Sequence, residues 1–559
     1  MAKANRRPLP DKLKKFIALL RSLILKTGAL EVIHLFTMLS VRYLPNRSSV
    51  YWQELILPIV LIAPLILLTY HLYFKLFKNP LTAHVATFSM LYVFFHFGYH
   101  FTSSSELAIG LSPVKLSSDF RIALGVLVLK FIVSGVIALA FNFFFTRLKL
   151  NKTVPAMKLL AFVIVFIAFN QAYKIADYNL RISDQTSFEY VLPDYKQDKS
   201  KIVSKPDIYY FVFDRYASNS WLRSEYGYDN SDLTSFLETQ GFTVRDDALS
   251  NYPFTISSVS STLAMEYHDE AMGDFKNKTT TFPLRSILNN PPVAQLLEQD
   301  GYQYTTVASW WGSTADKINA DHNLTSKAKL NLLGLKTSLT EFQELFADAS
   351  ALSYLYEPIL KNTQIDERQR PIDQIEDLIN ISKSDIGTPK FVFSHLLVPH
   401  SPYLFDENGD KPEYDRDGND EGVDEKVKYV AQLKYVNKLI KEVISAIRQN
   451  NPGAIIVLQA DEGPYPAEIR GKNFNHLEPI ESLSDHGLRS KYVIQAAYYF
   501  PNKDSASKIN SSVDAFRVTL NDYLGYDMPS LPSCQYSGRN LINARLGVYQ
   551  SPDCPIFSK

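Results

Sequence analysis

Four apolar stretches in the first 176 residues restrict the fold more than any other feature of this sequence. They cover residues 55–76, 82–101, 122–145 and 156–175. Each has about the 20 residues needed to cross a ~30 Å hydrocarbon core, and isolated spans must be helical because backbone groups cannot stay unpaired in lipid. Core helices of a soluble protein are the alternative, but four such runs with almost no acidic residues are difficult to explain that way. Residues 1–176 are therefore predicted to form a membrane domain.

A fifth segment, residues 16–41, is apolar but carries charged side chains, so it is either an interfacial amphipathic helix or a further span. The N-terminus and the connectors around residues 75–78 and 147–152 are basic. Basic connectors favour the cytoplasmic side, and placing all three there requires five crossings. We therefore predict a multi-pass protein of the inner (cytoplasmic) membrane, with the rest of the chain on the extracytoplasmic (periplasmic) side.

The charge distribution supports two regions in different environments. The chain has 58 basic and 58 acidic residues, yet residues 1–176 hold 20 Lys and Arg against 5 Asp and Glu, a net of +15, and the remainder has −15. Opposed halves of this kind indicate different surroundings. The acidic second part argues against a nucleic-acid partner, the 46% apolar content against a disordered chain, and two cysteines against a disulfide scaffold.

The second region is predicted to be a soluble α/β domain, residues 206–559, that follows a polar linker, residues 177–205. Apolar runs of strand length alternate with helical segments, which predicts a three-layer fold with a mainly parallel sheet covered on both faces. The expected strands are residues 207–214, 302–307, 391–397, 454–459 and 491–499. The expected helices between them include residues 256–265, 293–299, 372–381 and 425–448.

Polar and aromatic side chains follow the expected strands. They are Asp214 and Arg215; Trp310 and Trp311; His400 and Tyr403; and Asp461, Glu462 and Tyr465. Ligands of such sheets bind beyond the carboxyl ends of the strands, and acids at neighbouring strand ends repel each other unless a cation such as a divalent metal lies between them. For any single Asp the alternative is a helix N-cap. Thr255, directly before a predicted helix, is either a nucleophile at a helix N-terminus or only an N-cap.

These residues together resemble the alkaline phosphatase and sulfatase superfamily, over about residues 205–525. The likeness is greatest to its membrane-anchored branch of lipoteichoic acid synthases, phosphoglycerol transferases and phosphoethanolamine transferases. The phrases that carry it are Pro206-Asp-Ile-Tyr-Tyr-Phe-Val-Phe-Asp214, Ser250-Asn-Tyr-Pro-Phe-Thr255, His395-Leu-Leu-Val-Pro-His400-Ser-Pro-Tyr403 and Leu458-Gln-Ala-Asp461-Glu-Gly-Pro-Tyr-Pro466.

The resemblance implies roles for individual residues. Asp214 takes the place of the first acidic metal ligand, Thr255 that of the metal-bound nucleophile, and His400 that of a substrate-side histidine. Asp461 and Glu462 occupy the usual Asp-His pair of ligands. The expected substrate-binding residues are Arg215, Trp310, Trp311, His395, Tyr403 and Tyr465.

One departure from the family pattern affects the metal site. Glu462 stands where a histidine is usual, so the implied ligands are all oxygen, which suits Mn²⁺ or Mg²⁺ better than Zn²⁺. A true Asp-His-Gly occurs at residues 485–487, but no strand precedes it, so it is interpreted as a surface turn and remains the rival for the missing histidine.

The resemblance to sulfatases proper fails at the nucleophile. Those enzymes use a Cys or Ser within Cys/Ser-x-Pro-x-Arg, a context that Thr255 lacks. The only cysteines are Cys534 and Cys554. In an extracytoplasmic domain they are expected to form a disulfide, with two free thiols as the alternative.

The sequence therefore predicts a metal-dependent transferase that moves a phosphoglycerol or phosphoethanolamine group through a phospho-threonine intermediate. The expected donor is a membrane lipid and the expected acceptor is an envelope glycan or lipid. A phosphodiesterase or phosphatase with the same site, and a catalytically degenerate glycan-binding protein, are the alternatives.

Overall fold

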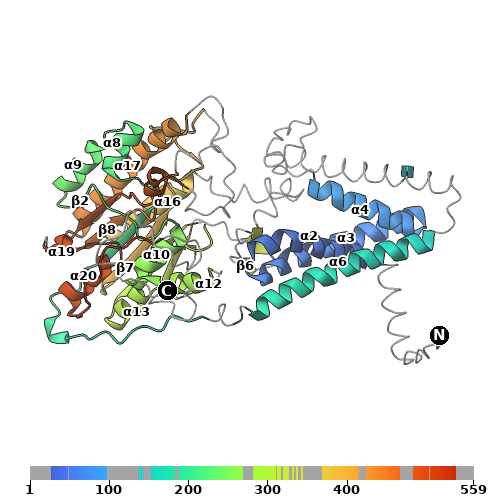
Figure 1. Ribbon diagram of the computed structural model, residues 1–559, viewed down its shortest axis with the longest axis horizontal. Coiled ribbons are helices and arrows are strands. Elements are labelled where there is room, and N and C mark those ends of the chain that lie inside the picture. The colour runs from blue at the N-terminus through green and yellow to red at the C-terminus, as the bar shows by residue number, and fades with distance from the viewer. Residues whose placement is uncertain are drawn as a thin grey trace. The chain divides into compact units, whose positions relative to one another are not determined.

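The computed structural model of the chain forms two compact units, residues 1–183 with 328–364, and residues 184–327 with 365–559 (Figure 1). Each unit is described by itself. The ranges described are 27–47, 50–96, 153–181, 188–268, 281–309, 311–315, 319–325, 330–332, 335–337, 368–413, 424–465, 483–502 and 504–536, together with residues 183, 342–343 and the five single positions 132, 136, 139, 140 and 143.

The first unit consists mainly of helices. They are α2 (Ala29–Asn46), the 3₁₀ turn η1 (Trp52–Leu55), α3 (Ile56–Phe77), α4 (Pro80–His96) and α6 (Thr153–Arg181). Within the described residues, one helix, residues 52–77, is long and apolar enough to cross a membrane. It contains the predicted span 55–76. The predicted span 156–175 lies in α6 and most of 82–101 in α4, whereas 122–145, apart from isolated positions, and the first part of 16–41 lie outside the described residues.

Polar contacts within this unit connect its helices to one another. His84 Nδ1, on α4, lies 2.6 Å from Glu31 Oε1 on α2, and both side chains are buried. A small apolar cluster forms around Leu35, Tyr43 and Ile62. Many other apolar side chains of α3 and α6 point outward, as shown by Phe162, which is 66% exposed.

The second unit contains a seven-stranded sheet in the order β2-β9-β8-β1-β7-β3-β4. The strands are β1 (Ile208–Phe213), β2 (Thr243–Arg245), β3 (Gln303–Ala308), β4 (His322–Thr325), β7 (Lys390–Leu396), β8 (Ile455–Gln459) and β9 (Ala496–Tyr499). All five predicted strands are present. The sheet is mixed, because β9 runs antiparallel to β8 and β2 antiparallel to β9. The first unit contains the remaining strands of the described residues, the antiparallel pair β5 (Leu330–Leu332) and β6 (Leu335–Thr337).

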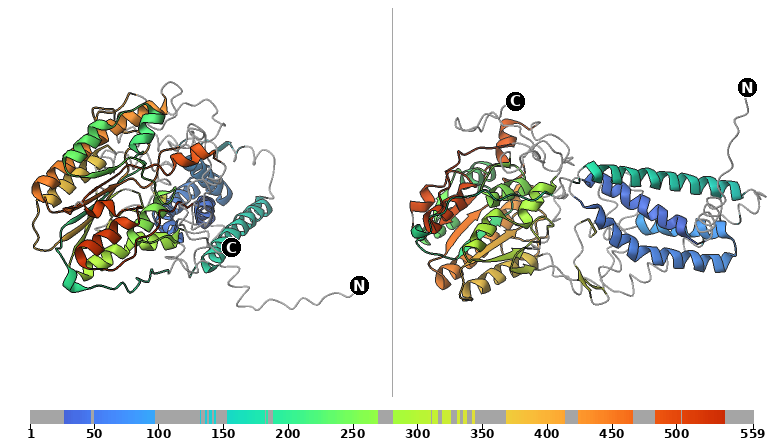
Figure 2. Two further views of the ribbon diagram at one scale, coloured as in Figure 1. Left: turned by 60° about the vertical axis from the view of Figure 1, so that its left-hand side comes forward. Right: turned by 90° about the horizontal axis from the view of Figure 1, so that it is seen from below.

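Helices cover both faces of this sheet (Figure 2). One face packs against α10 (Thr255–Ala264), α12 (Phe282–Asn289), α13 (Pro292–Gln299) and α20 (Asp514–Leu524). The other packs against α8 (Asn219–Tyr226), α9 (Ser231–Thr239), α16 (Gln369–Lys383) and α17 (Glu425–Asn450). Because successive strand residues point to opposite faces, Tyr210 and Val212 of β1 enter the first core, and Tyr209, Phe211 and Phe213 the second. The remaining described elements are η2 (Lys199–Lys201), α18 (Asp485–Ser490) and α19 (Asp504–Ser507).

Residues 188–205 are held against the second unit by hydrogen bonds. Tyr195 donates a hydrogen bond to Glu266 over 2.7 Å, and Asp198 N donates to the Gly525 carbonyl over 2.8 Å. Gly525 ends α20 with φ +73°, and a Cβ atom there would lie 2.4 Å from the Asp198 carbonyl oxygen. This close approach requires glycine. Gly525 therefore determines where residues 188–205 pass the end of α20.

Candidate metal centre

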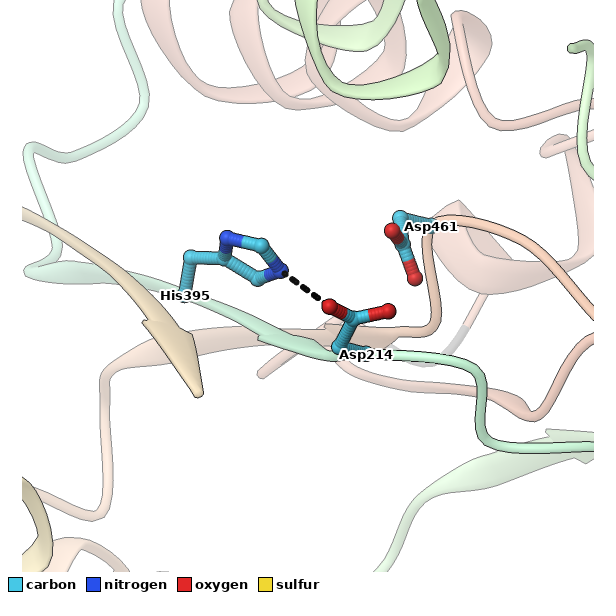
Figure 3. A group of neighbouring side chains, drawn as sticks. All are labelled: Asp214, His395 and Asp461. Carbon is cyan, nitrogen blue, oxygen red and sulfur yellow. Dashed lines mark ion pairs between the residues drawn. The ribbon is translucent and has the colours of Figure 1, made fainter. Parts of the chain in front are cut away.

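Three side chains converge at one edge of the sheet because β1 lies between two parallel neighbours, β7 and β8. Asp214 follows β1, His395 is the sixth residue of β7, and Asp461 lies two residues beyond β8. Their candidate ligand atoms all lie within 4.8 Å of one another. Figure 3 shows the imidazole and both carboxylates pointing toward a common point, with His395 Nε2 3.7 Å from Asp214 Oδ2.

The two carboxylates fit a divalent cation. Asp214 is 5% exposed and Asp461 1% exposed. Asp214 Oδ1 and Asp461 Oδ2 are buried and have no hydrogen-bond partner among the described residues. Burial raises the pKa of Asp214 well above its usual range, and the adjacent Asp461 carboxylate raises it further. Buried acids in this state are stabilised by a metal ion, and the group can supply two oxygen donors and one nitrogen donor.

Neighbouring groups orient these candidate ligands. Thr314 Oγ1 lies 2.8 Å from His395 Nδ1 and 2.8 Å from Ser309 Oγ, so the ring presents Nε2 toward the carboxylates. The backbone N–H of Arg215 donates to Asp461 Oδ1 over 3.0 Å. Such outer contacts fix the tautomer and direction of ligands in metal sites. No motif of the sequence connects Thr314 with the site.

Glu462 was expected among the ligands, but it does not belong to this group. Arg215 Nε donates to Glu462 Oε1 over 2.9 Å, and Lys491 Nζ pairs with Oε2. All three side chains are buried. Both oxygens of Glu462 are thus engaged by cations. His395, which was expected to bind substrate, instead offers a nitrogen donor to the candidate metal group. Because His395 lies within β7 and not after its end, the sequence pattern did not indicate it as a metal ligand.

Arg215 is held in an unusual conformation beside the metal group. It has φ +59°, a value that is rare for a residue other than glycine and is often found at functional sites. Its guanidinium carbon lies 3.5 Å from the centroid of the Tyr465 ring. Its NH1 is buried and has no hydrogen-bond partner among the described residues. Arg215 and Lys491 therefore place two positive charges next to the carboxylates.

His400 also lies near Tyr465, with 6.0 Å between the ring centroids. Desolvation lowers the pKa of His400 well below its usual value, and the positive charge of Arg215 lowers it further. Its Nδ1 contacts the Ser401 carbonyl oxygen, which can only accept a hydrogen bond. The neutral ring therefore carries its proton on Nδ1 and leaves Nε2 as a base.

Thr255 is the first residue of α10 and is half-buried. The preceding residue, Phe254, is the N-cap and has extended backbone, and its ring centroid lies 5.7 Å from Lys491 Nζ. The Thr255 hydroxyl forms no hydrogen bond within the described part of the chain. Thr255 thus begins the helix as predicted, and its neighbour Phe254 contacts a member of the charged cluster.

The remaining predicted residues have different surroundings. The Trp311 ring lies 6.0 Å from that of His395, whereas Trp310 is outside the described residues. Tyr403 is 3% exposed and donates to Glu425 over 2.8 Å, which is a packing environment. Cys534 is buried and disulfide-bonded, and Cys554 lies outside the described residues.

The rival Asp-His-Gly sequence is separate from the metal group. Asp485 and His486 begin the short helix α18, where the Gly487 N–H donates to the N-cap Ser484. The His486 side chain is 59% exposed and pairs with Glu225. This segment is on the surface, as expected, although it is a helical turn.

A mixed α/β sheet with buried acids and a histidine at its carboxyl edge fits the alkaline-phosphatase-like class of enzymes. The sulfatase family model matches residues 210–525, more than half of the chain. The chain therefore belongs to the sulfatase family and is an enzyme of the sulfatase-like type, which confirms the resemblance seen in the sequence.

Similar solved structures are distant. The C-terminal periplasmic domain of EcEptC from Escherichia coli is 15% identical, with a TM-score of 0.37 over 61% of this chain and 87% of that one. The integral membrane protein lipooligosaccharide phosphoethanolamine transferase A from Neisseria meningitidis is 11% identical, with a TM-score of 0.40 over 72% and 69%. The phosphonate monoester hydrolase of Agrobacterium radiobacter is 12% identical, with a TM-score of 0.36 over 58% and 74%. None of the curated proteins matches this sequence.

Proposed function

We propose that this protein is a membrane-anchored, metal-dependent transferase that moves a phosphoglycerol or phosphoethanolamine group from a phospholipid to an envelope glycan or lipid. The observation that carries the proposal is the group Asp214, His395 and Asp461, whose buried carboxylate oxygens lack partners among the described residues. Family membership supports transfer or hydrolysis at this site, and the lack of a Cys/Ser-x-Pro-x-Arg nucleophile argues against sulfate esters.

The membrane location is supported by the outward-facing apolar side chains of the first unit. Leu68 on α3 is 55% exposed, and Phe166 and Phe169 on α6 are 59% and 70% exposed. Exposed apolar surface on this scale is costly in water and favourable in lipid. We propose five spans in the inner membrane, with the catalytic unit on the periplasmic side, where a lipid donor is within reach.

The metal would be held by Asp214, His395 and Asp461, with the Thr255 hydroxyl as a further oxygen donor. A bound divalent ion would neutralise negative charge that develops on the reacting phosphoryl oxygens. The sequence argument for Mn²⁺ or Mg²⁺ over Zn²⁺ depended on oxygen ligands alone. With an imidazole in the set, Mn²⁺ and Zn²⁺ both suit the donors, so we propose Mn²⁺ first and a direct comparison with Zn²⁺.

Thr255 is the proposed nucleophile. Its oxygen forms a bond to phosphorus, the bond from phosphorus to the diacylglycerol oxygen breaks, and a phospho-threonine remains. The N-terminus of α10 directs backbone N–H groups toward the phosphoryl oxygens. An acceptor hydroxyl then attacks the same phosphorus and releases Thr255.

His400 and the Arg215–Lys491 pair have complementary roles in this proposal. Because His400 is neutral, its Nε2 accepts the proton of the attacking hydroxyl and returns it to the leaving oxygen. Arg215 and Lys491 offset the negative charge of the phosphodiester. Glu462 holds these cations in place, and Trp311 and Tyr465 are proposed to contact the head group.

The proposal is tested with the purified full chain, Mn²⁺ and phosphatidylglycerol or phosphatidylethanolamine labelled in the head group. We expect diacylglycerol release and a covalent adduct on Thr255 whose mass identifies the transferred group. Thr255→Ala should reduce release by about 1,000-fold or more, on the scale of losing a covalent nucleophile, while Thr255→Ser, which keeps the hydroxyl, should retain part of it.

Two results would redirect the proposal. Head-group release to water without transfer to any acceptor would favour the phosphodiesterase alternative. Diacylglycerol release that persists in Thr255→Ala would exclude Thr255 as the nucleophile, and absence of both metal binding and turnover would favour the binding-protein alternative.

A further inference from the structure

A cavity of about 570 Å³ lies in the first unit, at the C-terminal ends of α2 and α6. Its size is within the range of roughly 300–1,000 Å³ that is typical of small-molecule sites. Its walls combine apolar side chains, including Leu44 and Pro45, with the charged side chains of both helices. α2 and α6 are packed neighbours, and Asn179 Nδ2 on α6 donates to Tyr43 Oη on α2 over 3.4 Å.

The charged lining of the cavity is predominantly positive. Arg47, Lys174 and Arg181 oppose the single acid Asp177. Arg181 pairs with Asp177 one turn earlier on α6, which leaves Arg47 and Lys174 in excess. Lys174 forms no ion pair within the part of the chain that is described. The Arg47 guanidinium carbon lies 5.0 Å from the Tyr178 ring centroid, so an aromatic ring flanks this cation.

The cavity also contains an unused polar acceptor. Gln171 Oε1 is buried and has no hydrogen-bond partner among the described residues. A buried amide oxygen without a donor costs free energy, and a hydroxyl group of a ligand would satisfy it. The pocket therefore offers positive charge for an anion and an acceptor for a hydroxyl.

The surroundings indicate a ligand with long apolar chains. α6 continues from the cavity into an exposed apolar face that includes Phe162, Phe166 and Phe169. In the proposed topology this end of α2 and α6 is on the outer side, where the preference for cytoplasmic Lys and Arg gives no reason for three cations. We propose that the cavity binds the head group of an anionic glycerophospholipid, whose acyl chains lie along α6.

This inference concerns the first unit alone and does not depend on the transferase chemistry. Arg47 and Lys174 contact the phosphate, and Gln171 Oε1 accepts from a head-group hydroxyl. The same cations would be present if they only balanced the negative C-terminal ends of the helix dipoles, but such a role predicts no preference among lipids.

Native mass spectrometry of the full chain provides the test. The protein is released from detergent micelles that contain equal amounts of phosphatidylglycerol, phosphatidylethanolamine and phosphatidylcholine with identical acyl chains. Wild-type protein should retain phosphatidylglycerol at least about five-fold over either zwitterionic lipid. Arg47→Gln and Lys174→Gln should each reduce that retention about five-fold, the effect expected for one basic residue at an anionic lipid surface.

Matched variants separate a specific site from general attraction. Lys75→Gln removes an exposed cation of α3 that is not part of the cavity and should leave retention unchanged. Asp177→Asn should increase retention, because it releases Arg181. Thermal unfolding without added lipid establishes that each variant is folded. Equal retention of the three lipids by the wild type, or unchanged retention in a folded Arg47→Gln/Lys174→Gln variant, would overturn the proposal.

Discussion

Arg215 donates its Nε hydrogen to Glu462 Oε1 over 2.9 Å, so the carboxylate that the sequence assigned to a metal is the counter-ion of a buried arginine. Lys491 engages the other oxygen. The site thus combines a metal group with an adjacent pair of cations. The metal group and the pair of cations can be tested separately, because a substitution in one of them should still allow the properties of the other to be measured.

Glu462→Gln should destabilise the protein without removing the metal. The substitution leaves Arg215 and Lys491 buried without their counter-ion, which is expected to cost about 3–5 kcal/mol. Thermal unfolding of the full chain in detergent measures the loss, and elemental analysis of the folded fraction measures the metal. Glu462→Gln/Lys491→Met should recover part of the stability. Loss of bound metal in folded Glu462→Gln protein would instead make Glu462 a ligand.

Asp461→Asn should have opposite effects on the metal-free and metal-loaded protein. Without metal, the variant should unfold at a higher temperature than the wild type, because repulsion between Asp461 and Asp214 is removed. With metal, the wild type should gain stability in proportion to occupancy, and the variant should gain little. Thermal unfolding curves, recorded without metal and at increasing concentrations of Mn²⁺ and Zn²⁺, check both predictions. An equal gain in both proteins would contradict the assigned site.

Thr314→Val should weaken metal binding by about 10- to 100-fold, the usual effect of losing an outer contact to a ligating histidine. Valine keeps the shape of the buried side chain but removes the hydroxyl that lies 2.8 Å from His395 Nδ1. Thr314→Ser, which retains the hydroxyl, is the matched control and should bind metal as the wild type does. Isothermal titration with Mn²⁺ measures both. Identical affinities for valine and serine would show that His395 does not need this contact.

The buried His268 should cause the stability of the folded protein to decrease as the pH falls below neutral. Burial lowers the pKa of His268 to about 4 from 6.5, and the ring contacts the Ser257 carbonyl oxygen of α10. Since the unfolded chain takes up a proton near pH 6.5 and the folded chain only near pH 4, stability falls as the pH drops through this window. The decrease in the free energy of unfolding approaches about 3 kcal/mol. The difference in thermal midpoint between the wild type and His268→Gln, followed from pH 7 to pH 4, measures it. A constant difference would contradict the prediction.

The strands of the second unit were predictable because each is a short, continuous apolar run. The segment that became β1 is buried along its whole length, and the order of strands and helices followed the expected alternation. The direction of β9 was not predictable, because antiparallel pairing with β8 depends on how the chain returns to the sheet rather than on local pattern. Residues 177–205 were expected to be a linker because of their polar composition, which does not reveal that residues 198 and 203 form hydrogen bonds at the end of α20.

The candidate site was only partly predictable. Asp214 and Asp461 were found because acids that follow neighbouring parallel strands must meet at one edge of the sheet. His395 was assigned to substrate instead of metal, because its direction within β7 depends on the strand register, where it stands opposite Val212 of β1. The ion pairs of Glu462 were not predictable, because Arg215 and Lys491 approach it from other segments of the chain.

By itself, the sequence determined the apolar stretches, the strand pattern, the acids at strand ends and the threonine that begins α10. These are local properties, since length, periodicity and residue type act within a few neighbours. Only the tertiary structure decided which charged groups pair. Glu462 interacts with Lys491, 29 residues away, and with Arg215, 247 residues away. Such pairings depend on strand order and burial, which determine whether a buried carboxylate meets a metal or an amino-acid cation.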